Sequence, residues 1–275
     1  MPSFATAWPA SAAKVARRAR AVAERALARA PRAPNMHQSR GEQFYLDLYR
    51  GHLDPFLPAG AAILDLGCQY GRFTIPLARE GHHVVATDVD AAYGDYIRSQ
   101  LPPGTQAEFR QEDIRETVRN LEAESFDVIL CLEVLYVLPD FTQVLAALRP
   151  ALRPDGVLAA SHRSVGYYLY RFLAERSFDR LEEILEGRHP YFNCQSSQQL
   201  RSIYDELGYS VQHLAGIGLF SGMLADPFAR LNDPDSLSDA DQSVLAAYES
   251  REDLQALFAD NARYLLAISK KSAAH

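Results

Sequence analysis

The chain has 275 residues, of which 48% are hydrophobic and 23% charged, and its formal net charge is −7. This composition is close to that of average globular proteins, so it argues against a wholly disordered, collagen-like or coiled-coil chain. The charge is uneven, because residues 1–41 carry eight basic side chains and one acid, whereas the remainder carries 20 basic and 34 acidic side chains. An acidic body argues against a broad nucleic-acid-binding face, since duplex affinity comes largely from Lys and Arg at phosphates.

Residues 1–40 form a basic, Ala/Arg-rich segment that Pro31 and Pro34 bring to an end. We predict a weakly ordered or helical extension, with an organellar transit peptide and an RNA- or partner-binding arm as the alternatives. No stretch reaches about 18 consecutive apolar residues, so no membrane span is expected. The cysteines are few and widely spaced, which suggests a cytoplasmic protein with neither a disulfide framework nor a zinc site: Cys68, Cys131 and Cys194.

The first helical pattern begins at Gly41. Phe44 pairs with Leu48 and Tyr45 with Tyr49 at a spacing of four residues, which places both pairs on one face of a helix. We predict that this helix packs over or beside the site.

Five short apolar runs then alternate with helical patterns. The predicted strands are 61–66, 83–88, 107–109, 126–131 and 156–160, and the predicted helices are 73–78, 91–101 and 141–152. This alternation predicts an α/β fold with a doubly wound parallel sheet. Ligands bind at the carboxyl ends of such strands, where four acids fall: Asp65, Asp88, Asp113 and Glu133.

After Ser161 the alternation lapses into aromatic-rich helical patterns over 167–185. A helix at 197–207, a strand at 211–217, helical pieces at 243–248 and 254–258 and a last strand at 263–269 follow. We predict one domain over 41–275, with helical cap insertions at 163–195 and 219–260.

The turn after the first strand carries a recognisable motif. Ile63-Leu-Asp65-Leu-Gly67-Cys-Gln69-Tyr-Gly71 resembles the first motif of class I S-adenosylmethionine-dependent methyltransferases, an acid-x-Gly-x-Gly-x-Gly turn, with Gln69 at the middle glycine. The resemblance implies that Asp65 organises the turn, that Gly67 lets the backbone approach the cofactor, and that Gly71 permits close packing of strand and helix. Gln69 would contact the cofactor. The spacing does not fit the G-x-G-x-x-G turn of nicotinamide-dependent dehydrogenases.

Further positions match the same family in order. Asp88 has the position of the acid that binds the ribose hydroxyls, and Asp113 with Ile114 has the position of the adenine site. Taken alone, Asp113 is equally well explained as the N-cap of a helix. Leu132 and Glu133 end the fourth-strand motif, which in the family faces the methionine amino group.

The turn at residues 152–156 resembles the family's turn into the fifth strand, so the resemblance covers residues 61–162 with a tail to about 270. It implies a Rossmann-like sheet of about seven strands with an antiparallel last strand, S-adenosyl-L-methionine as cofactor, S-adenosyl-L-homocysteine as product, and no metal. We predict methyl transfer to oxygen or nitrogen of a small-molecule acceptor, in specialised metabolism. The alternatives are a nucleotide-binding protein without transfer activity on the same fold, and an RNA methyltransferase that uses the basic arm. Monomer and homodimer both remain open.

The acceptor side offers fewer matches. Many small-molecule relatives carry Glu-Val-Leu-Glu-His after the fourth strand, whereas here the run is Glu133-Val-Leu-Tyr136-Val137, so that histidine has no counterpart. The candidate catalytic residues are His162, predicted just past the fifth strand, His189 in the cap, and Tyr136. The alternative for His162 is a bond to local backbone. Four cap tyrosines either line an acceptor pocket or pack the cap: Tyr167, Tyr168, Tyr170 and Tyr191.

Overall fold

The computed structural model describes residues 39–190, 192–222 and 231–272, and within them a seven-stranded sheet has the order β3-β2-β1-β4-β5-β7-β6. The strands are β1 (Ala62–Leu66), β2 (His83–Asp88), β3 (Ala107–Gln111), β4 (Phe126–Cys131), β5 (Leu152–Arg163), β6 (Tyr209–Ile217) and β7 (Tyr264–Lys271). β7 runs antiparallel to its neighbours β5 and β6, whereas β1 to β5 pair in parallel. The predicted doubly wound sheet with an antiparallel last strand is confirmed. The predicted basic extension lies outside the described residues, apart from its last two positions.

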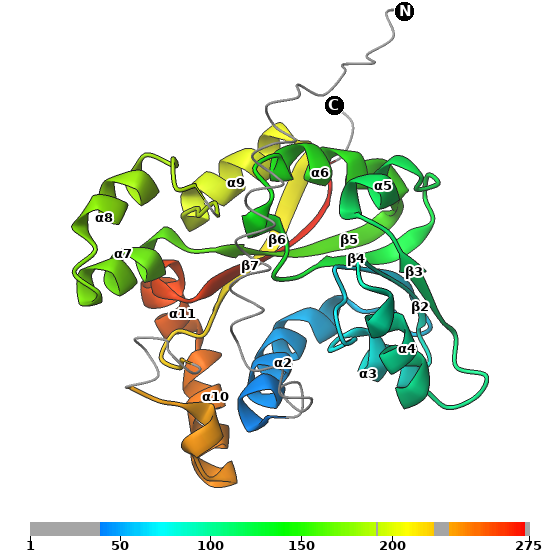
Figure 1. Ribbon diagram of the computed structural model, residues 1–275, viewed down its shortest axis with the longest axis horizontal. Coiled ribbons are helices and arrows are strands. Elements are labelled where there is room, and N and C mark those ends of the chain that lie inside the picture. The colour runs from blue at the N-terminus through cyan, green and yellow to red at the C-terminus, as the bar shows by residue number, and fades with distance from the viewer. Residues whose placement is uncertain (1–38, 191, 223–230, 273–275) are drawn as a thin grey trace, which may run out of the picture.

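Helices cover both faces of this sheet (Figure 1). One face carries α5 (Ile114–Arg119), α6 (Phe141–Leu148) and α9 (Ser197–Glu206), and the other carries α2 (Arg40–Leu53), α3 (Thr74–Arg79) and α4 (Ala91–Gln100). Short 3-10 helices lie in the connections between the longer elements: η2 (Asp54–Phe56), η3 (Leu135–Val137), η4 (Arg149–Ala151), η6 (Pro234–Ser236) and η7 (Ala259–Asn261). Each face of the sheet therefore buries its own apolar core.

α2 is the helix predicted from the aromatic pairs. Its N-terminus is capped by Ser39, whose hydroxyl accepts a hydrogen bond from the backbone N–H of Glu42. The helix buries Phe44 and Tyr45 with their partners one turn later. Those side chains join the core that also holds β1, β4 and the start of β7.

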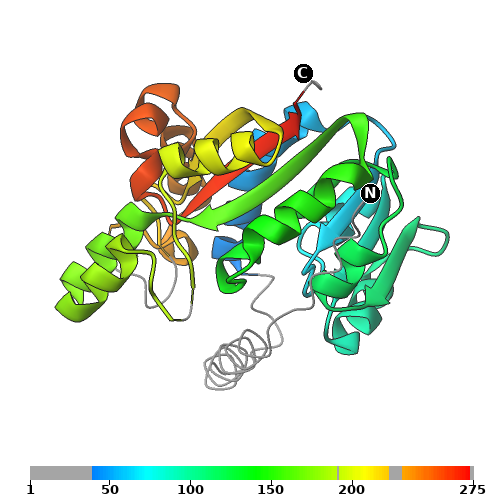
Figure 2. The same ribbon diagram turned by 90° about the horizontal axis from the view of Figure 1, so that it is seen from above.

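Two helical insertions lie at the end of the sheet where β5 finishes and β7 begins (Figures 1 and 2). After β5 come α7 (Val165–Ala174) and α8 (Phe178–Leu185), and between β6 and β7 come α10 (Asp239–Glu249) and α11 (Glu252–Phe258). These helices fall in the predicted segments 163–195 and 219–260. Residues 191 and 223–230 of those segments lie outside the described residues.

β5 is longer than the sequence predicts. It continues through His162 to Arg163, because the antiparallel ladder with β7 extends to the pair Arg163 and Tyr264. The prediction that His162 lies just past the strand is therefore wrong. The helix predicted over 141–152 is also too long, since Pro150 follows its end at Leu148 and lies in a 3-10 turn.

Candidate functional site

The turn after β1 requires glycine at two positions. Gly67 has φ 69°, and a Cβ there would lie 2.5 Å from Cγ2 of Val134. Gly71 has φ 76°, and its Cβ would lie 2.7 Å from Cγ1 of Ile97. Both positions therefore combine a left-handed backbone with a close approach of another element.

Gln69 keeps a glycine-like backbone although it is not a glycine. Its φ is 46°, in the left-handed region that ordinary side chains rarely occupy. The conformation aims its backbone N–H at the Oδ2 atom of Asp88, 3.0 Å away. The turn is therefore tied to the end of β2 by a backbone donor, which a glycine would supply equally well.

Asp65 joins β1 to the start of α3. Its side chain is 3% exposed, and Oδ2 accepts a hydrogen bond from the Thr74 hydroxyl at 2.6 Å. Burial raises the pKa of Asp65 to about 6. The hydrogen bond from Thr74 to Asp65 thus joins the two ends of the turn, which is the arrangement that the organising role implied by the resemblance requires.

Asp88 presents its carboxylate at the end of β2. One oxygen accepts from Gln69, and the other accepts from the backbone N–H of Val89 at 2.7 Å. The side chain is half-buried, and this burial raises its pKa. The carboxylate lies at the carboxyl edge of the sheet, as the sequence predicts.

The end of β3 lies next to the end of β2, because the backbone N–H of Glu112 donates to the carbonyl of Asp88 at 2.9 Å. Asp113 follows and caps α5 by accepting from the backbone N–H of Arg115 at 2.9 Å. The N-cap alternative for Asp113 is confirmed. Ile114 beside it is 9% exposed.

Glu133 follows β4 and lies on the other side of the glycine turn. Its φ is 60°, and its backbone N–H donates to the hydroxyl of Ser161 at 2.6 Å. Its carboxylate pairs with Arg72, whose guanidinium also pairs with Oε2 of Glu42 at 3.0 Å. The preceding Leu132 is 6% exposed.

Charge around Glu133 outweighs its burial. Burial by itself raises the pKa of this carboxyl, but the nearby cations Arg72 and Arg263, together with hydrogen bonds from Arg72 and Tyr264, lower it below its ordinary value. Glu133 is therefore a carboxylate held ionised between two cations. Sequence reasoning missed Arg72, although its place directly after Gly71 is a usable signal.

His162 does not face the site. Its ring is fully buried in the core, where Nε2 lies 3.0 Å from the Tyr204 hydroxyl and the ring packs edge-on against Phe141. Burial lowers the pKa of His162 to about 3. A proton acceptor must reach the substrate, so we interpret His162 as a packing residue, and the predicted catalytic role is not supported by its position.

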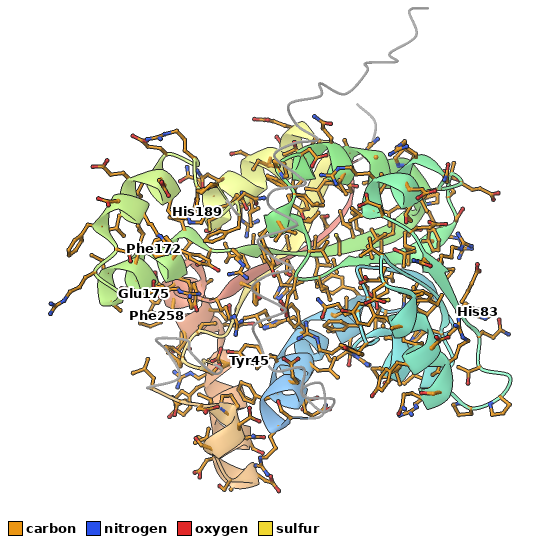
Figure 3. The ribbon with its side chains drawn as sticks, in the orientation of Figure 1. Tyr45, His83, Phe172, Glu175, His189 and Phe258 are labelled. Carbon is orange, nitrogen blue, oxygen red and sulfur yellow. The ribbon has the colours of Figure 1, made fainter. Side chains whose placement is uncertain are left out.

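His189 lies in the loop after α8, where its ring centroid is 4.0 Å from that of Phe192 and 5.8 Å from that of Phe172. Figure 3 shows His189 and Phe172 together in the α7–α8 region, at the opposite side of the molecule from His83. Burial lowers the pKa of His189. Of the four tyrosines predicted to line an acceptor pocket or pack the cap, Tyr167 and Tyr168 are buried. Tyr170 is 52% exposed, and Tyr191 lies outside the described residues.

A group of side chains around Arg163 was not predicted. We call it the aromatic–arginine cluster and define it as Arg163 with the rings of Tyr136, Tyr168, Phe192 and Tyr264. The guanidinium carbon lies 3.9 Å from the Tyr136 centroid. Arg263, beside Tyr264, adds a second cation close by.

The loop after α8 is fastened over this cluster by hydrogen bonds to the backbone. The side-chain amide of Asn193 donates to the carbonyls of Leu135 and Leu138, both at 3.0 Å. The backbone N–H of Gln195 donates to the carbonyl of Arg163 at 3.0 Å. The loop thereby holds Phe192 near Arg163 at the end of β5 and against Tyr168 of α7.

The polar groups at this edge fit a nucleoside that carries an amino acid. Asp88 offers a carboxylate suited to ribose hydroxyls, and the left-handed turn brings backbone close to any ligand above it. Among the described residues, no group of three His, Cys, Asp or Glu side chains is arranged to hold a metal ion. Nor does any helix of the described part have the length and apolarity needed to cross a membrane.

Comparison with known proteins agrees with this geometry. The family model described as a methyltransferase domain matches residues 64–160. A ubiquinone biosynthesis O-methyltransferase of Actinobacillus pleuropneumoniae serotype 5b is 34% identical over 163 residues, covering 57% of this chain and 69% of the relative. The enzyme of the same name from Xanthomonas axonopodis pv. citri is 28% identical over 174 residues, covering 62% of this chain and 69% of the relative.

Solved structures share the fold at low sequence identity. The 1,6-didemethyltoxoflavin-N1-methyltransferase of Burkholderia thailandensis matches with a TM-score of 0.56 and 16% identity, covering 99% of this chain and 94% of that one. An S-adenosylmethionine-dependent methyltransferase of Mesorhizobium loti matches with a TM-score of 0.53 and 18% identity, covering 82% of this chain and all of that one.

Proposed function

The chain belongs to the class I S-adenosylmethionine-dependent methyltransferase family, and we propose that its acceptor is a small molecule methylated on oxygen or nitrogen. S-adenosylmethionine supplies an already activated methyl group. The protein's contribution is to hold the acceptor in line with that methyl group and away from water, which can supply roughly 7–11 kcal/mol.

We assign the residues at the carboxyl edge of the sheet to the cofactor. Asp88 would accept hydrogen bonds from the ribose hydroxyls, and Asp113 with Ile114 would border the adenine. The methionine end would lie over the glycine turn, near Leu132 and Glu133. The full proposed set is Asp65, Gly67, Gln69, Gly71, Asp88, Asp113, Ile114, Leu132 and Glu133. We add Arg72 to it as a positioning residue, because Arg72 pairs with Glu133.

The observation that carries the small-molecule proposal is the place of Glu133. Its carboxylate pairs with Arg72 beside the glycine turn and also accepts a hydrogen bond from Tyr264 of the aromatic–arginine cluster. An acceptor in that cluster would therefore lie directly beside the cofactor turn. The insertions 163–195 and 219–260 lie around this end of the sheet, and we interpret them as caps of a compact acceptor pocket.

Two residues remain candidates for contact with the acceptor. Tyr136 is half-buried in the wall of the cluster. His189 packs against Phe192, and burial lowers its pKa, which favours the neutral ring. The O-methyltransferases among the relatives favour a hydroxyl acceptor.

The cofactor assignment is tested by titrating the chain with S-adenosylmethionine and S-adenosylhomocysteine in a calorimeter. Asp88→Ala removes an ionised acceptor for two ribose hydroxyls, so we expect affinity to fall by about 100-fold. Asp95→Ala is the matched control, because Asp95 is an exposed acid on α4. Its affinity should equal that of the wild type.

Unchanged affinity in Asp88→Ala would overturn the ribose assignment. The acceptor proposal is tested separately, by measuring release of S-adenosylhomocysteine with phenols, amines, RNA and protein as acceptors. Turnover of phenols or amines is expected. Turnover of RNA or protein alone would contradict the proposal.

A further inference from the structure

Arg163 is surrounded by aromatic rings, and in the described part of the chain its guanidinium meets no carboxylate. Its guanidinium carbon lies 3.9, 5.2, 5.4 and 5.7 Å from the centroids of Tyr136, Tyr168, Phe192 and Tyr264 respectively. No acid of the described residues forms an ion pair with it. Its Nε is buried and lacks a hydrogen-bond partner within that same part of the chain.

This situation differs from that of Arg72, the other arginine of the site with defined partners. Arg72 is also stacked near aromatic rings, but two glutamates pair with its guanidinium. A guanidinium removed from water without an anion is costly, and cation–π contacts offset only part of that cost. Arg163 therefore has capacity for an anion that none of the residues in 39–190, 192–222 and 231–272 supplies.

The position of Arg163 connects this capacity to the acceptor. Arg163 pairs in register with Tyr264, and Tyr264 donates a hydrogen bond to Glu133 at the end of β4. Tyr136, directly under the guanidinium, lies in η3, which begins two residues after Glu133. An anion bound at Arg163 would therefore lie near Glu133, which the proposed function places beside the methionine end of the cofactor.

We propose that the acceptor is a small aromatic acid whose carboxylate pairs with Arg163 and whose ring packs among Tyr136, Tyr168, Phe192 and Tyr264. The proposal rests on the proposed function. A planar guanidinium matches a carboxylate through two parallel hydrogen bonds, and aromatic walls stack well on an aromatic ring. Arg163 is then a specificity-determining residue.

The test compares an acid with its neutral counterpart. The chain, saturated with S-adenosylhomocysteine, is titrated with 4-hydroxybenzoate and with 4-hydroxybenzamide, which has nearly the same shape but no charge. We expect the acid to bind about 10- to 100-fold more tightly, as for a hydrogen bond to a charged group. In Arg163→Gln that preference should vanish, whereas affinity for the amide should persist.

Two variants separate charge from folding. Arg163→Lys keeps the charge but loses the paired geometry, so it should retain part of the preference. Arg153→Gln changes an exposed arginine at the far end of the same strand and should retain all of it. Because the readout is a ratio of two affinities on the same sample, partial unfolding of a variant does not imitate the effect.

With 4-hydroxybenzoate as methyl acceptor, Arg163→Gln should raise KM by a similar factor and change kcat much less. Equal affinity of wild type for acid and amide, binding of neither, or an undiminished preference in Arg163→Gln would overturn the proposal. Loss of S-adenosylhomocysteine affinity in Arg163→Gln would also overturn it, because Arg163 would then serve the cofactor. Failure of the wild type to bind S-adenosylhomocysteine at all would instead refute the proposed function.

Discussion

The glycine turn after β1 and the aromatic–arginine cluster at the end of β5 meet at Glu133 but are assembled in different ways. The turn comes from residues 65–71, and its geometry is held by backbone groups: the N–H of Gly67 donates to the carbonyl of Thr87 at 2.8 Å, and the N–H of Gln69 donates to Asp88. The cluster takes side chains from five separate elements or loops, and its charge lies on half-buried or buried groups. We therefore expect changes to the backbone geometry of the turn, or to Asp88 that it contacts, to act on cofactor affinity, and changes at the cluster to act on stability and acceptor choice.

A substitution of Glu133 gives the strongest test of this difference between the glycine turn and the aromatic–arginine cluster, because Glu133 contacts both. Glu133→Gln keeps the shape but removes the carboxylate between Arg72 and Arg263, so we expect the free energy of unfolding to fall by about 3 kcal/mol. Because the folded-state pKa of Glu133 is lowered, its contribution is present above the ordinary value of 4.5 and is lost as the pH falls below it. Urea denaturation at pH 7 and pH 4 measures both.

The matched control is Glu80→Gln, which breaks the exposed pair with Arg50. We expect it to cost less than about 1 kcal/mol. A loss in Glu133→Gln no greater than in the control would mean that the two halves of the site are not joined through this carboxylate.

His162 lies outside both the turn and the cluster, so it shows how a buried titratable group affects stability without a role in binding. Its folded-state pKa of about 3 lies below the ordinary 6.5, so the neutral form is favoured and stability is lost as the pH falls below 6.5. We expect the wild type to lose about 2 kcal/mol from this group between pH 8 and pH 5, and His162→Gln to lack that loss. The difference between the two denaturation curves isolates it from other titrating groups. A large drop in kcat of His162→Gln at pH 8, with the fold intact, would restore the catalytic role.

Gln69 gives the smallest expected effect. Gln69→Gly relieves a left-handed φ of 46° and should raise the free energy of unfolding by at most about 1 kcal/mol, offset in part by the freedom of glycine in the unfolded chain. Affinity for S-adenosylmethionine should not change, because the backbone donor to Asp88 remains. Glu124→Gly, at a φ of 53° away from the site, should give a similar gain. A gain in cofactor affinity in Gln69→Gly alone would show that the glutamine side chain obstructs the cofactor.

The difference between the turn and the cluster also explains which parts of the site the sequence can predict. The turn, Asp88 and the order of the strands follow from local patterns, since strand ends and glycine spacing are read within a few residues. The cluster depends on the register of β5 with β7, which brings Arg163 opposite Tyr264 across a hundred residues of chain. The position of His162 was predicted wrongly for the same reason: three further pairs of that ladder, from Ser161 to Arg163, extend β5 through His162. A change in register by one residue turns every side chain to the other face, and composition does not encode it.

The reversed direction of β7 has a further consequence. β6 ends and β7 begins at the same edge of the sheet, paired at Ile217 and Tyr264, so everything between them is the loop of one wide hairpin. Exchanging or lengthening such a loop leaves the sheet pairing intact, because both of its anchors stay in place. The cofactor turn lies on other strands and would not be altered. If the segment between β6 and β7 caps the acceptor as we propose, its sequence can change to suit a different acceptor while the sheet and the turn assigned to the cofactor stay the same.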